Sequence, residues 1–219
     1  GFAVPAVLGS RSTTVRVRLG GLDGRALIAE DRLPLAHATP TDAFERSAHP
    51  LDLTRPDRLR ILIGEPGRDF AADAMAAFLA GSYSVTTAAD RMGLRFSGPV
   101  IMSQRPGDGL SEGLAPGAIQ IPGDGQPILL LADRQTTGGY PRIAHVISAD
   151  LAAAGRLRPG DAVRFEAVDL AVAAQARRFQ ADMIAKFAAS ITPVAGPRAI
   201  DGAALAGVNL VSGVVSGDD

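Results

Sequence analysis

Short apolar runs that end near glycine or proline constrain the fold of this chain more than any other feature of its sequence. Apolar and polar side chains alternate within several of these runs, which is the period of a β-strand. The 25 glycines and 15 prolines supply the turns that separate them. We therefore expect strands in TTVRVRL (13–19), RLRILIGEP (58–66), YSVTTAA (83–89), RMGLRFSGP (91–99), AIQIP (118–122), PILLLAD (127–133) and LRPGDAVRFEAV (157–168), and a last one in VNLVSGVV (208–215).

Two segments show the helical period instead. Residues 68–82 place apolar side chains on one face, and Asp69 is suited to cap this helix. Residues 169–191 form the longer pattern, with Asp169 in the capping position. Many short strands with a few helices predict a mainly β fold of the α+β class, a barrel or sandwich with flanking helices.

The domain organisation follows from a change in composition before residue 58. Residues 36–57 are polar, contain three prolines and lack a clear period, so we interpret them as a linker or an extended surface crossing. We expect residues 1–57 to be the end of an N-terminal subdomain with its linker, 58–192 to be the barrel domain, and 193–219 to be a C-terminal tail.

Composition excludes several classes of function. The net charge of −1 gives no basic field for nucleic acid, and no apolar run reaches the length of a membrane span. The chain has no cysteine, which removes disulfides and thiolate chemistry and fits a reducing compartment, so we expect a cytoplasmic protein. Lys186 is the only lysine, and its helical surroundings do not resemble a biotin-attachment turn.

Motifs for nucleotide, dinucleotide and metal chemistry are absent. The sequence contains no GxxxxGK[ST], no GxGxxG after a strand and no HExxH. The three histidines, His37, His49 and His145, are far apart. We interpret His37 and His49 as solvated linker residues and His145 as a core or strand-facing residue in preference to a catalytic base, and we expect no metal site.

A dense polar segment follows the strand PILLLA, and it supplies the first candidate site. Polar groups at the end of a strand, next to two glycines that permit close approach, are a common way to build a ligand site. The residues alone leave a second interpretation equally open, a tight turn whose side chains satisfy their own backbone. The candidates are Asp133, Arg134, Gln135 and Tyr140 for catalysis and Thr136 and Thr137 for substrate binding.

Three further polar clusters have the same character. Residues 111–127 include Gln120 and Gln126, residues 88–93 include Arg91, and residues 9–13 include Arg11. Each alone favours a structural role, but four clusters in one chain predict that some of them converge on a pocket. We add Arg11, Arg91, Gln120 and Gln126 as substrate-binding candidates, with the arginines for carboxylate or phosphate.

These clusters carry a resemblance to a known family. The motifs GSRST, GGLDGRAL, DRLPL, ADRMG, SEGLAPGAIQIPGDGQPILLLADRQTTGGYPRIAHVISADL and LRPGDAVRF, in this order, resemble the biotin-dependent carboxyltransferase and allophanate hydrolase subunit 2 family. The resemblance runs from Leu8 to Phe165, and the stretch from Gly113 to Asp150 is long and specific. Family members usually carry a longer segment before GSRST, including a pattern similar to G-L-x-T-x-x-Q-D-x-G-R, so we expect this chain to be a fragment or a processed chain.

The resemblance implies a cyclophilin-like β-barrel and a role inside a larger enzyme. It implies a subunit of an ATP-dependent 5-oxoprolinase, which opens the small cyclic amide 5-oxoproline to L-glutamate. It also implies partners, namely the B subunit of the same enzyme system and a third subunit of the LamB/YcsF type. Without a P-loop, the ATP site would be unconventional or shared with those partners.

Two alternatives stay open beside this hypothesis. One is the carboxyltransferase component of a biotin-dependent carboxylase acting on urea or another amide, with biotin that is not attached to this chain. The other is a regulatory binding protein without catalysis, of the type that antagonises a kinase inhibitor. A single sequence does not separate these alternatives.

Overall fold

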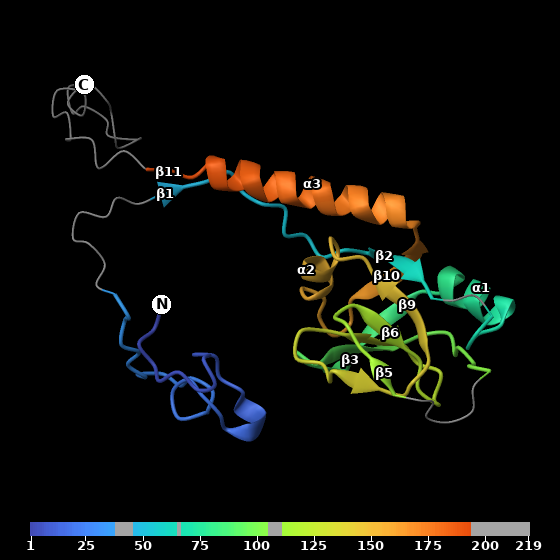
Figure 1. Cartoon of the computed structure of the whole chain (residues 1–219), viewed down its shortest axis with the longest axis horizontal. Coiled ribbons are helices and arrows are strands. Elements are labelled where there is room, and N and C mark those ends of the chain that lie inside the picture. The colour runs from blue at the N-terminus through green and yellow to red at the C-terminus, as the bar shows by residue number, and fades with distance from the viewer. Residues whose placement is uncertain (38–45, 65–66, 105–110, 194–219) are drawn as a thin grey trace, which may run out of the picture. The chain divides into compact units, whose positions relative to one another are not determined.

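The computed structural model describes residues 1–37, 46–64, 67–104 and 111–193 (Figure 1). The described chain forms two compact units. One contains the described residues among Gly1–Ser47 together with Thr192 and Pro193, and the other contains the described residues of Ala48–Ile191.

The larger unit is built around a closed β-barrel of seven strands. Neighbouring strands pair in the order β10-β2-β9-β6-β7-β4-β3, and β3 pairs with β10 to close the ring. Among the described residues β2 and β10 are parallel, and the other pairs of the barrel are antiparallel. The strands are β2 (Arg58–Ile63), β3 (Tyr83–Ala89), β4 (Gly93–Ser97), β6 (Ala118–Gln120), β7 (Ile128–Leu130), β9 (Arg142–Val146) and β10 (Ala162–Ala167).

Side chains along each strand alternate between the interior and the surface of the barrel, and the inward-pointing apolar side chains fill it. In β2 the side chains of Leu59 and Ile61 are fully buried, whereas Arg58 at the start of the strand stays exposed. The same period places Val163 and Phe165 of β10 inside. The predicted mainly β fold with a barrel and few helices is confirmed.

An aromatic cluster occupies the centre of this core. The ring of Phe165 stacks on Phe78 with centroids 4.8 Å apart, and lies 5.4 Å from the ring of Tyr83 and 5.7 Å from that of Phe96. All four residues are at most 3% exposed. Since Phe165 contacts the other three rings, it joins strand β10 to the helix and strands around it.

Both predicted helices form. α1 (Ala72–Ala80) packs beside β10 and buries Phe78, and α3 (Leu170–Ala189) begins at an N-cap where Asp169 Oδ1 accepts a 2.8 Å hydrogen bond from the amide of Val172 (Figure 1). The predicted cap at Asp169 is thus confirmed, but the one at Asp69 is wrong. α1 starts later, at Ala72, and its N-cap makes no side-chain hydrogen bond.

Several short elements were not predicted. They are the helix α2 (Leu151–Ala154), the ribbon of β5 (Glu112–Gly113) with β8 (Thr137–Gly138), and the ribbon of β1 (Arg46–Ser47) with β11 (Thr192–Pro193). Strands of two residues and a single helical turn leave too few residues for a periodic pattern. The strand expected at 208–215 lies outside the described residues.

In the smaller unit the strand predicted at residues 13–19 is wrong. Val15–Val17 form a 3-10 turn (η1), and the amides and carbonyls of Thr14 and Leu19 bond to each other at 2.8 and 3.2 Å across it. Arg18 takes a left-handed backbone with φ of 52°. The segment closes on itself, so its alternating valines are exposed and pair with no neighbouring strand in the part of the chain that the structure describes.

A bidentate ion pair organises the following loop of the smaller unit. Both carboxylate oxygens of Asp31 accept 2.7 Å hydrogen bonds from Arg25, and the amide of Ile28 donates to the same carboxylate. Hydrogen bonding from Arg25 lowers the pKa of Asp31 to about 2.

Among the described residues, no helix has the length and apolar composition needed to cross a membrane.

Replacing Phe165 by alanine is expected to lower the free energy of unfolding by about 3–5 kcal/mol, because it empties the centre of the aromatic cluster. Urea unfolding followed by circular dichroism measures this loss. Phe179→Ala is the matched control, since Phe179 on α3 is 70% exposed. Equal losses for the two variants would contradict the position of Phe165 at the centre of the core.

Tyr83→Phe is expected to leave the free energy of unfolding at pH 7 unchanged or up to about 1 kcal/mol higher, because the buried Tyr83 hydroxyl has no hydrogen-bond partner among the described residues. Burial raises the pKa of Tyr83 to about 12. The unfolded chain releases the tyrosine proton near its usual pKa of about 10, whereas the folded state keeps it until about 12, so the free energy of unfolding is unaffected by this ionisation below pH 10 and falls as pH rises through 12. Unfolding between about pH 9 and 12, compared for wild type and Tyr83→Phe, measures it. An equally steep alkaline loss in the variant would argue against a buried tyrosine here.

Candidate functional site

The β5–β8 ribbon joins two of the polar clusters. Glu112 lies opposite Gly138 and Gly113 opposite Thr137, and the amide of Leu114 donates a 2.9 Å hydrogen bond to the carbonyl of Thr136. Clusters that are far apart in sequence are therefore adjacent in the fold. The ribbon sets Glu112 beside Gly138 of the polar segment that follows β7.

A third cluster is tied to the same loop. Both carboxylate oxygens of Asp133 accept hydrogen bonds from Arg91, at 2.7 and 3.0 Å, and the backbone of Arg91 accepts from the amide of Asp133. Hydrogen bonding from Arg91 lowers the pKa of Asp133, although the pair is exposed. Arg134 donates from Nε to the carbonyl of Leu114 at 3.1 Å. These contacts hold the loop in place and use part of the donor capacity of both arginines.

A small pocket opens beside the ribbon, and Glu112 is one of its lining residues. One carboxylate oxygen accepts a 2.5 Å hydrogen bond from Nη2 of Arg68, and the other lies 3.8 Å from Nη2 of Arg142. The three side chains are between one third and one half exposed, so solvent and small molecules reach them. The pocket has a volume of about 140 Å³ and is lined by Gly64, Arg68, Asp69, Phe70, Met75, Glu112, Arg142 and Ile143.

A second, much smaller cavity of about 10 Å³ lies next to the predicted polar loop. It shares Asp69, Glu112 and Arg142 with the pocket and reaches Gly138, Gly139 and Tyr140. Beside this loop lies Gln120, which is 1% exposed and donates from Nε2 to the carbonyl of Tyr140 at 3.3 Å. The buried amide thus fixes the backbone of the loop at Tyr140, whose side chain is 42% exposed.

Two acidic groups in this pocket differ in environment. Glu112 lies between two guanidinium groups, whereas Asp69 is only 9% exposed and lines both cavities. The carbonyl of Asp69 accepts hydrogen bonds from the amide of Gln104 and from Oγ of Ser103, at 2.8 and 3.1 Å. These bonds fix the backbone of Asp69 ahead of α1, which explains its presence in the pocket and its absence from the helix cap.

His145 belongs to the barrel wall. Its Nε2 lies 2.9 Å from the carbonyl of Pro116, which accepts from the ring, and burial lowers its pKa. The side chain lines neither cavity of the candidate site. This position fits the interpretation of His145 as a strand-facing residue.

The remaining predicted residues occupy other positions. Gln126 clamps the backbone of Gly98, accepting at 2.9 Å and donating at 3.3 Å, at a turn of the barrel. Arg11 belongs to the smaller unit, where its Nε donates to the carbonyl of Val4 at 3.2 Å. Gln135, Thr136 and Thr137 are exposed on the loop. Catalytic or binding roles for these residues stay predictions.

Sequence reasoning missed the two arginines of the pocket. Arg142 stands directly after Pro141 at the start of β9, and Arg68 precedes α1, so neither lies in a polar cluster. Glu112 could have pointed to these arginines. It is a lone acidic residue in a glycine-rich turn, and a partly buried carboxylate needs a cationic partner. Among the described residues, no group of three or more histidine or acidic side chains is arranged to hold a metal ion.

With this geometry established, comparison with known proteins identifies the class of the chain. It belongs to the family of carboxyltransferase domains, subdomains A and B, whose family model matches residues 1–167.

Two individual relatives are similar to the chain over most of its length. The chain is 40% identical over 181 residues to the C subunit of 5-oxoprolinase from Haemophilus influenzae, an alignment that covers 81% of this chain and 57% of the relative. It is 38% identical over 180 residues to the C subunit of 5-oxoprolinase from Escherichia coli, covering 82% of this chain and 57% of the relative. The chain therefore spans a little over half of the length of these relatives.

Solved structures agree with the fold. The crystal structure of the Kluyveromyces lactis urea carboxylase superposes with a TM-score of 0.73 at 27% identity, covering 88% of this chain and 20% of that one. The K. lactis urea amidolyase gives the same TM-score and identity, covering 88% of this chain and 14% of the longer one.

Gly138→Ala is expected to lower the free energy of unfolding by about 1–3 kcal/mol, because overpacking a buried contact has a cost of this size. An added Cβ would lie 2.8 Å from Cδ1 of Leu114 and 3.2 Å from Nε2 of Gln120, both of which are buried. Thermal unfolding measures the change. Gly113→Ala, on the partner strand of the same ribbon with no atom within 4 Å of the new Cβ, is the control and should not be destabilised. Loss of stability in the control alone would refute this packing.

Proposed function

We propose that this chain is part of a subunit of an ATP-dependent 5-oxoprolinase, which opens 5-oxoproline to L-glutamate together with a B subunit and a third subunit of the LamB/YcsF type. The observation that supports this proposal most is the 40% identity to the C subunit of a 5-oxoprolinase across 81% of the chain. The chain spans 57% of that relative. We therefore propose the activity for the assembled enzyme and not for this chain alone.

The Glu112 pocket supports the same proposal on chemical grounds. A cyclic amide acid presents a carboxylate and a ring amide, and guanidinium groups bind carboxylates through paired hydrogen bonds. Arg142 is the better candidate for this role, because its 3.8 Å contact with Glu112 is the looser of the two. A pocket of about 140 Å³ matches a small substrate in size.

The chemistry explains why ATP would be consumed. An unstrained amide is a poor electrophile at neutral pH, and phosphorylation of its oxygen converts that oxygen into a leaving group. Positive donors near the developing charge stabilise such a transition state. In this chain Arg68 and Arg142 supply that positive charge, while Asp69 and Glu112 are the acidic groups available to orient a water molecule.

A second candidate function is carboxyl transfer to urea or another amide in a biotin-dependent carboxylase. The superposition on the K. lactis urea carboxylase with a TM-score of 0.73 favours it. In this candidate the biotin would not be attached to this chain, because its only lysine, Lys186, lies on the helix α3. This candidate predicts that activity requires biotin. The oxoprolinase proposal predicts activity without biotin.

The test is ATP-dependent release of glutamate from 5-oxoproline. The full-length protein is combined with the products of its neighbouring genes, and the reaction is run with and without this subunit. We expect glutamate only when the subunit is present. Absence of glutamate from a verified stable complex would overturn the oxoprolinase proposal, and biotin-dependent carboxylation of urea would then distinguish the second candidate.

Arg142→Gln in the assembled enzyme tests the role of the pocket. Loss of one charge-assisted hydrogen bond to the substrate, worth about 1.5–3 kcal/mol, lowers kcat/KM by roughly 10- to 150-fold. Arg95→Gln is the matched control, because Arg95 is exposed on β4 and lines neither cavity. Wild-type kinetics from a folded Arg142→Gln enzyme would remove this pocket from the proposal.

A further inference from the structure

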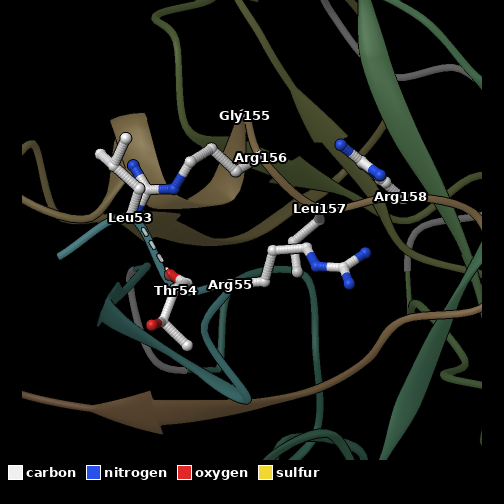
Figure 2. A pocket seen from close by; sticks show the side chains of 7 residues that line it. All are labelled: Leu53, Thr54, Arg55, Gly155, Arg156, Leu157 and Arg158. Carbon is white, nitrogen blue, oxygen red and sulfur yellow. Dashed lines mark hydrogen bonds between the residues drawn. The ribbon is translucent and has the colours of Figure 1, made fainter. Parts of the chain in front are cut away.

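A second and larger pocket lies elsewhere in the barrel unit, and none of its lining residues belongs to the Glu112 pocket. It has a volume of about 530 Å³, within the range of small-molecule sites. Its walls are the segment before β2 and the loop after α2 (Figure 2). The lining residues are Leu53, Thr54, Arg55, Gly155, Arg156, Leu157 and Arg158.

The loop after α2 is rigidly held. Leu157 is only 6% exposed and joins the hydrophobic core. Arg158 begins a tight turn in which the amide of Asp161 donates to the carbonyl of Arg158 at 3.0 Å and Asp161 Oδ2 accepts from the amide of Arg158 at 2.7 Å. Pro159 and Gly160 fill its central positions, and Gly160 has the positive φ of 90° that such a turn requires. The Arg158 backbone is therefore fixed at the rim of the pocket.

The opposite wall is tied to this loop by two arginines. Arg156 donates from Nη2 to the carbonyl of Thr54 at 3.3 Å, and Nη1 of Arg55 lies 3.1 Å from Oδ1 of Asp161. Residues 48–57 contain no helix or strand, so these contacts set the position of the wall. Figure 2 shows the Arg156 side chain running toward Leu53, and those of Arg55 and Arg158 on the other side of the pocket.

The pocket has an excess of positive charge and unused donors. Its lining contains three guanidinium groups and no carboxylate. Two acidic residues interact with them from outside: Asp161 pairs with Arg55, and Asp52, whose pKa is lowered first by hydrogen bonds from Thr54, also feels the charge of Arg156. One positive charge remains in excess. Among the described residues, Arg158 has no side-chain partner, and Nε of Arg156 is buried without a hydrogen bond.

We propose that this pocket binds the phosphate of a small molecule, with Arg158 and Arg55 as the principal ligands. A phosphate dianion offers three acceptor oxygens and so can engage two guanidinium forks at once, which a carboxylate with two oxygens does less well. Exposed Leu53, at 62%, gives an organic phosphate an apolar surface beside the charged groups. The inference does not depend on the oxoprolinase proposal.

Isothermal titration calorimetry on the full-length protein tests this site. Inorganic phosphate, triphosphate and ATP are titrated separately at constant ionic strength, with chloride as the competing anion. We expect saturable binding of at least one phosphate compound, and at least a tenfold weaker affinity in Arg158→Gln and in Arg55→Gln. Arg177→Gln, which changes an exposed arginine on α3, should bind as the wild type does.

Each outcome of the titrations decides the proposal. Equal affinity for triphosphate and ATP would show that the phosphate chain alone is recognised, and tighter binding of ATP would show that the site takes a nucleotide. Absence of saturable binding by all three compounds would overturn the proposal. Wild-type affinity in both Arg158→Gln and Arg55→Gln, with native circular dichroism spectra, would overturn it as well. Since no step uses 5-oxoproline, failure here leaves the activity test unaffected.

Discussion

Closure of the barrel depends on strand β2, which pairs with β9 on one side and with β10 on the other. The β2–β10 pairing brings Leu59 opposite Phe165, although the two residues are far apart in sequence. Forming such a contact has a large cost in chain entropy, which the aromatic core around Phe165 offsets. A closed ring also removes the unpaired edges that an open sheet would present. Core and closure therefore stabilise each other.

The direction of β2 determines where both pockets lie. β2 and β10 are parallel, so the segments that precede them meet at one end of the barrel, and these segments contain Arg55 and Arg158. β2 and β9 are antiparallel, so the residue after β2, Gly64, meets the start of β9 at Arg142, at the other end. The two pockets are thus consequences of the same three strands and are separated by the length of β2.

The sequence predicted regular elements well and local clusters poorly. The segment 83–89 was predicted as a strand with the bounds that β3 has, because its side chains alternate between core and solvent. Residues 13–19 alternate as well, but a left-handed residue at Arg18 closes them into a turn, and alternation carries no information about that. In the candidate site, Glu112 and Gly138 are adjacent because of the β5–β8 ribbon. Its strands have two residues each, which is too short to show a periodic pattern in the sequence. The ion pairs of Glu112 follow from tertiary packing alone, so Arg68 and Arg142 were missed.

Reliance on arginine has a chemical consequence for both ends of the barrel. The chain has one lysine among 22 basic residues, so its anion-binding chemistry is guanidinium chemistry. Guanidinium groups stay protonated throughout the accessible pH range and bind through planar forks, so their affinity for an anion does not titrate. How strongly each pocket attracts an anion then depends on the carboxylates that share its arginines. Glu112 shares two of them in the smaller pocket, whereas in the larger pocket Asp161 pairs with Arg55 and Asp52 interacts with Arg156.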